Sequence, residues 1–259
     1  MNKYIVHTGE KKHLVISHVS DETAQWQIVQ EADSVLTIHL FCLEKDADIS
    51  HDVVLDIEQA GEHAETYIYG LGILSGKQQI SVHTRVRHSV PNGKSNQLLK
   101  FAVKDEARGA FLGELIVAPH AQHTEAQQTN RNILLSPAAT MQTQPQLEIY
   151  ADDVKCSHGA STGQIDESAL FYMQQRGIAP DVARQLLLAA FFHDVLTTLG
   201  EPAVEKRLQR RIAEAFEQSE ISIRRSRSFE QSEISIRRSR SFEQSEISYG
   251  EADRSSKAR

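Results

Sequence analysis

Short segments in which apolar and polar residues alternate fill the first 157 residues, and this period of two constrains the fold more than any other feature. Alternation over about four to eight residues is typical of β-strands with one buried face. After an alternating start at 3–19, we predict strands near 25–30, 34–43, 51–58, 64–70, 79–87, 97–103, 111–117, 123–128, 132–135 and 147–157. Because no repeat of fixed length is visible here, the period leaves a sandwich, a barrel and a parallel β-helix open.

The periodicity becomes helical after Gly163. Asp166 is a suitable N-cap and Gly177 a suitable C′ residue for a first helix, with an apolar stripe of Ala169, Leu170 and Met173. A second helix is predicted from Pro180 to Gly200. Its apolar residues recur at helical spacing and cover more than one side: Val182, Leu186, Ala189, Ala190, Phe191 and Leu196, widened by Leu187, Leu188, Phe192 and Leu199. A third helix is predicted at about 202–216. The pattern fits equally a cap on the β core and a docking surface for another protein.

The stretch 145–177 joins the two halves and carries one of the two cysteines. If the strand predicted at 147–157 continues, Val154, Cys156 and His158 point to one face. A thiol and an imidazole on one face are suited to a soft metal or a sulfur species, and the imidazole could favour the thiolate. One cysteine and one histidine do not complete a tetrahedral site, so further ligands must come from elsewhere or from another chain.

Other polar residues have simpler interpretations beside the functional ones. Cys42 shares a face with apolar neighbours and is most simply a small buried hydrophobe. His39 lies within an apolar strand and is interpreted as a core histidine whose polar atoms are satisfied. The histidines His120 and His123 have a spacing that suits a metal on a helix, but their neighbours are strand-like. The alternating residues His83, Arg85 and Arg87 form either a basic patch for an anionic partner or a solvated strand face.

Composition excludes several function classes. The 28 basic and 35 acidic residues give a net charge of −7, which argues against a general affinity for nucleic acid. Two cysteines in different surroundings do not make a disulfide framework. No apolar run has the length of a signal peptide or a membrane span. We therefore expect a cytoplasmic protein without membrane contact. The sequence also lacks the glycine fingerprint of a dinucleotide site.

Three segments carry a family resemblance: LEIYADDVKCSHGASTGQIDESALFYMQQRGI at 147–178, FLGELIVAPHAQHTEAQQTNRNILLS at 111–136, and ARQLLLAAFFHDVL at 183–196. They resemble the SufB/SufD family of iron–sulfur cluster assembly proteins, strongly over about residues 80–200. The C-S-H form at Cys156–His158 favours the SufD branch. The resemblance implies a mainly β fold, with a right-handed parallel β-helix core at 1–160. A small C-terminal α-helical segment at 161–215 would follow and dock an ATPase.

The resemblance also implies a function. The chain would be a scaffold subunit of a cytosolic iron–sulfur cluster assembly complex and would catalyse no reaction alone. It would pair with a SufB-like subunit through the exposed end of the β-helix, with a homodimer as the other possibility, and bind SufC-like ABC-type ATPases through its helices. In the family the histidine of C-S-H lies at the subunit interface where the nascent cluster forms. His158 is therefore the first candidate metal ligand and Cys156 the second. A transient iron–sulfur cluster and a reduced flavin are the implied cofactors.

Two features depart from the family pattern. Family members carry a helical domain before the β-helix, whereas here Met1 opens almost directly onto the strand pattern. The unit FEQSEISIRRSRS occupies 216–228 and 229–241 and begins again at 242–248, so we predict a disordered tail at 216–259.

Two alternative functions stay open at this point. One is a structural β-helix subunit whose C-S-H is inert. The other is a β-helix enzyme acting on polysaccharide, with Asp152 and Asp153 as its paired carboxylates. Adjacent residues on a strand point to opposite faces, which places that pair poorly.

Overall fold

The computed structural model describes residues 2–17, 24–43 and 48–200, together with residues 206 and 210. Twelve strands precede two helices, and all of them belong to one compact unit, Met1–Ile212. The strands are β1 Asn2–Val6, β2 Lys11–Ile16, β3 Ala24–Gln30, β4 Val35–Cys42, β5 Ser50–Gln59, β6 Glu65–Leu74, β7 Gln79–His88, β8 Lys94–Val103, β9 Arg108–Val117, β10 Glu125–Leu134, β11 Thr140–Ile149 and β12 Lys155–Gly163. The helices are α1 Glu167–Gln175 and α2 Pro180–Thr197.

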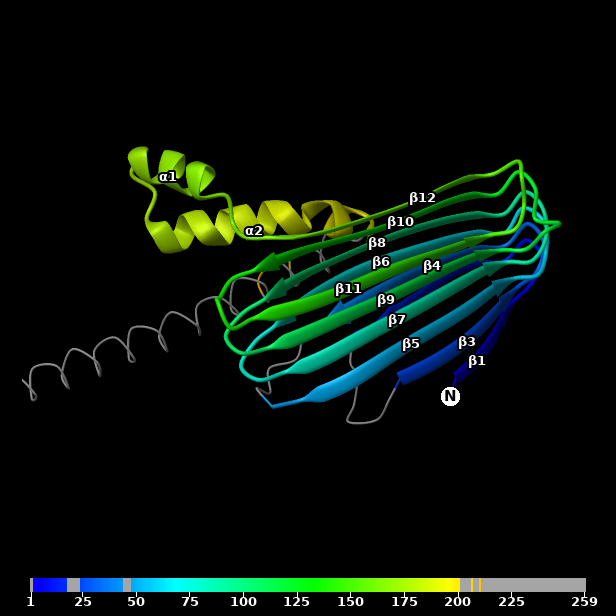
Figure 1. The fold of residues 1–259 in the computed structure, drawn as a ribbon, viewed down its shortest axis with the longest axis horizontal. Helices are drawn as coiled ribbons and strands as arrows, with labels where there is room; N and C mark the ends of the chain where they lie inside the picture. Colours follow the sequence, from blue (N-terminus) through cyan, green and yellow to red (C-terminus); the bar gives the residue numbers. More distant parts are fainter. Residues whose placement is uncertain (1, 18–23, 44–47, 201–205, 207–209, 211–259) are drawn as a thin grey trace, which may run out of the picture. The chain divides into compact units, whose positions relative to one another are not determined.

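Successive strands alternate between two six-stranded parallel sheets (Figure 1). The odd sheet has the order β1-β3-β5-β7-β9-β11, and the even sheet has the order β2-β4-β6-β8-β10-β12. Two consecutive strands therefore complete one coil, and each coil stacks on the one before it. This confirms the predicted mainly β fold with a parallel β-helix core and a small helical segment at its C-terminal side.

A repeat that the sequence does not display sets the coil length. Gln79 pairs with Ser50 and with Arg108, so the spacing is 29 residues on both sides. The turns that lead into the first five even strands, β2 to β10, each have a residue of positive φ two positions before the strand begins: Gly9, Asp33, His63, Asn92 and His123. Glycine, asparagine and aspartate tolerate this left-handed conformation best. Different residue types occupy this turn position, and the coils differ slightly in length. The repeat therefore cannot be recognised in the sequence as a motif.

The core lies between the two sheets, where every second side chain of each strand points inward. It is apolar through the first coils and is made mostly of Ile, Leu, Val and Phe, including Ile28, Leu36, Leu55, Ile68, Val82, Leu99, Phe101 and Phe111.

One corner of the core is polar. Gln30, Gln59 and His88 occupy the same register position on successive odd strands. Gln59 Nε2 donates to the carbonyl oxygen of Lys94 at 2.9 Å, and Gln30 Nε2 donates to that of Glu65 at 3.0 Å. These bonds satisfy buried polar groups while tying one coil to the next.

Three strand predictions near the end of the β-helix were wrong. The segments predicted at 123–128 and 132–135 form one strand, β10. The segment predicted at 147–157 is divided by a turn, so its first residues end β11 and its last begin β12. The physical reason is the polarity of these coils. Gln128, Asn130 and Asn132 face inward and are buried, so inward positions no longer differ from outward ones in hydropathy.

The helix ends were predicted correctly from local chemistry. The Asp166 side chain caps α1 by accepting from the backbone N–H groups of Ser168 and Ala169. Gly177 has a φ of 82° after the C-cap, and the Ile178 N–H bonds the carbonyl of Met173, as in a Schellman motif. Pro180 opens α2, and Gly200 follows it with a φ of 68°. No helix among the described residues is both long and apolar enough to cross a membrane.

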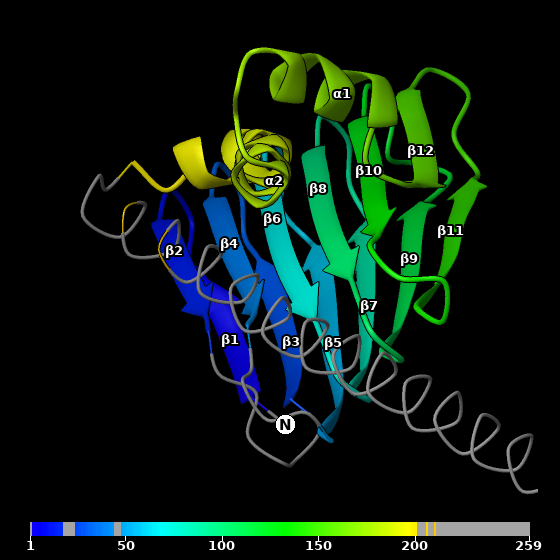
Figure 2. The ribbon, with the colours of Figure 1, turned by 90° about the vertical axis from the view of Figure 1, so that its left-hand side faces the viewer.

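Helix α2 lies over the outer face of the even sheet, above β4, β6 and β8 (Figure 2). Outward-facing residues of these strands are buried there, namely Phe41, Leu71, Ile73 and Ala102. The helix buries Ala183, Leu188, Phe192, Val195 and Leu196, whereas Val182 and Leu186 are exposed. The predicted stripe that began with Val182 and Leu186 is therefore not the buried one. Apart from residues 206 and 210, which are helical, the third predicted helix lies outside the described residues, as does the tail at 216–259.

His39 is a buried core histidine, as predicted. Its Nδ1 lies 2.7 Å from His13 Nε2, its Nε2 lies 2.9 Å from Thr198 Oγ1, and its ring stacks on that of Tyr69. Burial, reinforced by His13, lowers the pKa of His39 to about 4. Burial alone lowers the pKa of His88 to about 4, and His88 Nε2 lies 2.9 Å from Ser95 Oγ.

These two histidines predict a loss of stability in mild acid. The folded chain binds fewer protons than the unfolded chain between pH 6.5 and about 4, so acidification across this window favours unfolding. At about 1.4 kcal/mol per pKa unit, each histidine contributes up to about 3 kcal/mol of this loss. Urea unfolding from pH 7 to pH 4 measures it. H39Q and H88Q should each flatten the profile relative to the unsubstituted chain, and exposed His63→Asn should not. Identical slopes in all four proteins would contradict the assignment.

Candidate functional site

The candidate site lies on β12, the last strand of the even sheet, at one end of the stack of coils (Figure 2). Cys156 pairs in register with Ala126, and His158 pairs with Gln128. Both pairs extend columns of inward-facing, buried residues on β4, β6, β8 and β10. Cys156 and His158 therefore share the inward face of the last coil. They share a face as the spacing predicts, although the strand that carries them begins at Lys155.

Cys156 is half-buried and has no disulfide partner. It packs against an apolar cluster of Leu115, Val117, Ala121, Ala126 and Ala151. Burial raises the pKa of the Cys156 thiol, against a smaller lowering contribution from a backbone hydrogen bond with Ala126. The thiol is therefore protonated at neutral pH in this chain alone. The expectation that the neighbouring imidazole favours the thiolate is wrong for the isolated chain. Cys42, in contrast, is fully buried in the main core, as predicted.

His158 is exposed and contributes to a shallow pocket along β10 and β12. Beyond it the inward face becomes polar. Asn132 Nδ2 lies 2.7 Å from Asn130 Oδ1, 3.0 Å from Thr143 Oγ1 and 3.2 Å from Thr162 Oγ1. This network joins β10, β11 and β12. These residues were not predicted as site residues from the sequence, although polar side chains at every second position, as in Gln128, Asn130 and Asn132, indicate a polar interior of the coil.

Cys156 and His158 alone do not make a closed metal site. Within the described ranges, no group of three or more His, Cys, Asp or Glu side chains could hold a metal ion. A closed site for a soft metal needs about four ligands, often thiolates and imidazoles. Cys156 and His158 can supply two of them at the end of the β-helix, where a second chain could supply the rest.

The two edge strands at this end differ in their capacity to pair with another strand. From 156 to 163 the sequence of β12 is CSHGASTG, which contains no charged residue. Charged residues and prolines are the usual protection of an exposed edge. The edge of β11 has Pro145 near its middle, and proline cannot donate a backbone hydrogen bond. An incoming strand is therefore best accommodated on β12.

The other polar candidates are not brought together with Cys156 and His158. On the outer face of the odd sheet, Glu114 pairs with both Arg85 and His83, and Asp56 pairs with Arg85, so this is a charge-balanced strand face rather than a basic patch. His123 is a positive-φ turn residue, and its Nδ1 lies 3.0 Å from Asp153 Oδ2. Its spacing from His120 therefore reflects a turn.

The paired carboxylates considered for polysaccharide chemistry lie in the turn between β11 and β12. Asp153 makes the ion pair with His123, and its backbone N–H donates to Gln122 Oε1. These are contacts that close the turn. Nothing in the described part of the chain gives Asp152 and Asp153 a joint catalytic geometry.

A protein-family model described as "SUF system FeS cluster assembly, SufBD core domain" matches residues 10–191. The chain is 38% identical over 159 residues to an iron–sulfur cluster assembly SufBD family protein of Synechocystis sp., and this match covers 61% of the chain and 35% of that protein. It is also 38% identical over 154 residues to the iron–sulfur cluster assembly protein SufD of Escherichia coli, which covers 60% of the chain and 36% of that protein.

A SufBD family protein of Mycobacterium leprae is 30% identical over 220 residues, covering 77% of the chain and 56% of that protein. The chain thus spans about a third of the length of the first two relatives and about half that of the third. The regions of similarity include most of the β-helix described above.

Proposed function

Because the chain belongs to the SufB/SufD family of iron–sulfur cluster assembly proteins, we propose that it acts as a SufD-like scaffold subunit on which clusters form. The proposal rests mainly on the match of the SufBD core domain to residues 10–191, which contain the β-helix from β2 to β12 and the end formed by β11 and β12. By this proposal the chain supplies ligands and a rigid support, works in the cytoplasm, and has no catalytic residue of its own.

A SufB-like subunit pairs with the chain at the end formed by β11 and β12. Support comes from the uncharged edge of β12 and from the incomplete ligand pair on its inward face. Backbone pairing to an exposed sheet edge is a common means of strand recognition. A second copy of this chain is the other candidate for the same edge, and the experiment below distinguishes the two.

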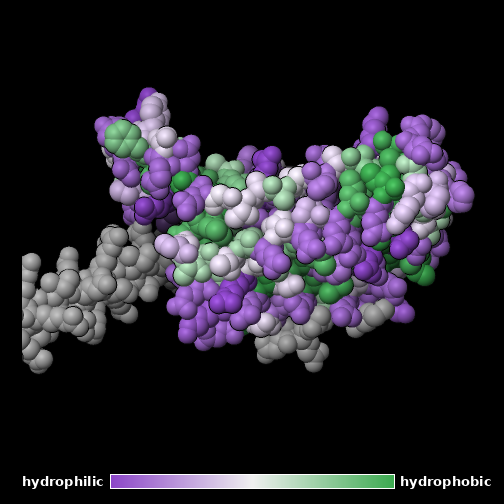
Figure 3. Space-filling view, in the orientation of Figure 1, coloured by the Kyte–Doolittle hydropathy of each residue, from purple (hydrophilic) through white to green (hydrophobic). Residues whose placement is uncertain are grey.

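SufC-like ABC-type ATPases dock on α1 and the first half of α2. Four large apolar side chains are exposed there: Phe171 at 62%, Tyr172 at 58%, Val182 at 43% and Leu186 at 49%. Figure 3 shows apolar surface on α1, which is otherwise hydrophilic. Clustered exposed apolar and aromatic residues are a feature of protein interfaces. The buried side of α2 already covers the β-helix, so the exposed side is free to contact a partner.

The nascent cluster is the cargo of the complex. His158 and Cys156 are the ligands that this chain contributes, and the partner contributes the others. Because the Cys156 thiol has a raised pKa, iron must displace its proton on binding. Cluster loading is therefore expected to be favoured by a rise in pH. The reduced flavin implied by the resemblance is supported neither by the described residues nor by the relatives.

Anaerobic reconstitution tests the proposal. The full chain is mixed with a SufB-like subunit, a SufC-like ATPase, ferrous iron and a sulfide source, and cluster formation is followed by visible absorption and Mössbauer spectroscopy. The scaffold role is supported if a stable complex forms and its cluster signals increase in proportion to the amount of this chain in the mixture. A complex that forms equally well without the chain, or a chain that only self-associates, would count against it.

A further inference from the structure

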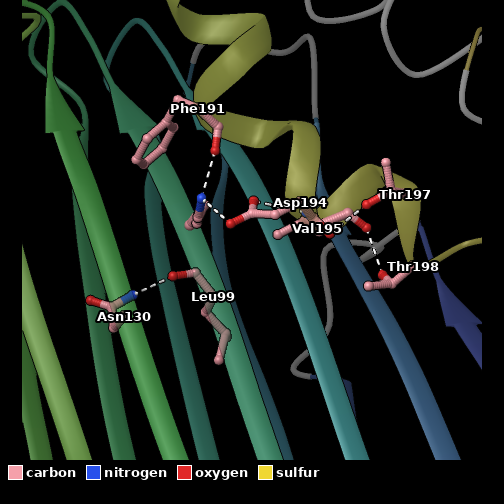
Figure 4. Close-up of polar contacts among 8 residues, drawn as sticks. Leu99, Asn130, Phe191, Asp194, Val195, Thr197 and Thr198 are labelled. Carbon is pink, nitrogen blue, oxygen red and sulfur yellow. Dashed lines mark hydrogen bonds and ion pairs between the residues drawn. The ribbon is translucent and has the colours of Figure 1, made fainter.

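Lys100 is a buried lysine on the outer face of β8, beneath α2. Its Nζ donates to the carbonyl oxygen of Phe191 at 2.7 Å and to Asp194 Oδ2 at 2.6 Å. The same ammonium lies 4.8 Å from the centre of the Phe191 ring. The Lys100 side chain is 5% exposed and that of Asp194 is 50% exposed. Figure 4 shows Phe191 and Asp194 on α2 turned toward the strand.

Helix α2 also packs on the sheet through apolar side chains. Its buried apolar residues, among them Leu188, Phe192 and Val195, already cover the sheet. Burying an ammonium group costs free energy that an apolar side chain would not cost. Apolar contact is non-directional, however, so a helix held only by apolar residues can shift along the sheet. The three contacts of Lys100 instead fix two residues one helical turn apart to a single position on β8.

The residue before Lys100 begins a chain of contacts toward the candidate site. The carbonyl oxygen of Leu99 accepts from Asn130 Nδ2 at 3.2 Å, which joins β8 to β10 (Figure 4). Asn130 Oδ1 accepts from Asn132 Nδ2, and that amide also reaches Thr162 Oγ1 on β12. Asn130 and Asn132 are both buried. Buried polar groups in such a network hold their partners in specific positions.

We propose that Lys100 is a positioning residue that couples α2 to β12. Through Lys100, Leu99, Asn130 and Asn132, a displacement of α2 changes the position of the strand that carries Cys156 and His158. This inference rests on the proposed function, because the displacement comes from ATPases bound to the helices. The coupling depends on the contacts that hold α2 at one position along β8. It does not depend on the exposed apolar side chains that bind the ATPase.

The test measures deuterium uptake by residues 155–163 in the complete complex, before and after addition of a non-hydrolysable ATP analogue. In the unsubstituted complex the analogue should change the uptake. Lys100→Met keeps an apolar side chain of similar length and should reduce that change roughly threefold to tenfold, with the ATPase still bound. The control is Lys12→Met, which removes a lysine whose side chain is 39% exposed, near Glu10 at the other end of the stack.

A second variant separates coupling from helix docking. Asn132→Ala leaves the contacts of α2 intact but breaks the network before β12, so it should lose the same response. An unchanged response in both Lys100→Met and Asn132→Ala would overturn the inference while leaving the proposed function intact. An unsubstituted chain that binds no ATPase would overturn both. Loss of the response in Lys100→Met alone would assign the lysine to helix docking and overturn the coupling.

Discussion

Replacement of both Cys156 and His158 by alanine is expected to lower cluster formation by the reconstituted complex about a hundredfold or more. Both side chains extend inward-facing columns of the even sheet at its open end, and the described residues offer no third ligand beside them. Removal of a residue that only hydrogen-bonds to a metal ligand lowers metal affinity about tenfold to a hundredfold. Removal of two residues that bind the metal directly is expected to cost more. Cluster content per complex, measured by iron and sulfide analysis with visible absorption, checks the result.

The matched control for this prediction lies on the same strand. Ser157 and Ser161 alternate with the candidate ligands and point to the outer face, so S157A and S161A should leave the cluster content unchanged. Partner binding should be the same in all variants, since backbone pairing along β12 does not depend on these side chains. A double variant of Cys156 and His158 with normal cluster content would show that the C-S-H segment is inert and that the chain has a structural role only.

Introduction of a charge into the apolar surface of the helices is expected to weaken ATPase binding about thirtyfold or more. Leu186 is half exposed on α2 without a role in the buried side of that helix. Loss of a central apolar contact in an interface costs about 2 kcal/mol or more, and burying a new carboxylate adds to it. Leu186→Glu and Phe171→Glu, assayed by calorimetry against the ATPase, provide the measurement.

The control is Val15→Glu, which places the same charge at an exposed apolar residue of β2, away from α1 and the first half of α2. It should bind the ATPase with unchanged affinity. Circular dichroism of each variant distinguishes a lost contact from a lost helix. If Leu186→Glu and Phe171→Glu fold and bind the ATPase as tightly as the unsubstituted chain does, the docking surface lies elsewhere.

Local chemistry made some features predictable from the sequence. The Asp166 cap, the Gly177 turn and the Pro180 start depend on residues within a few positions of one another, and the structure confirms them. The deeper burial of Cys42 compared with Cys156 was also predictable, because Cys42 has apolar neighbours in the sequence and Cys156 has polar ones. The shared face of Cys156 and His158 required only a strand at that place, although its boundaries were predicted incorrectly.

Features that depend on distant residues could not be predicted in this way. The inward face of β10 is polar, so alternation of hydropathy does not mark Gln128, Asn130 and Asn132 as inward. Which side of α2 is buried depends on β6 and β8, which come about a hundred residues earlier in the chain. The bond between Lys100 and Asp194 joins residues 94 positions apart. The parallel β-helix itself was expected from family resemblance, because strand period alone fits several folds.

The measurement that tests the central claim most directly is anaerobic affinity purification of the full chain from its own cells, with mass-spectrometric identification of the bound proteins. A SufD-like scaffold should copurify with a SufB-like subunit and an ABC-type ATPase in fixed proportion, with iron and sulfide in the same fraction. A folded chain recovered without either partner would contradict the scaffold role.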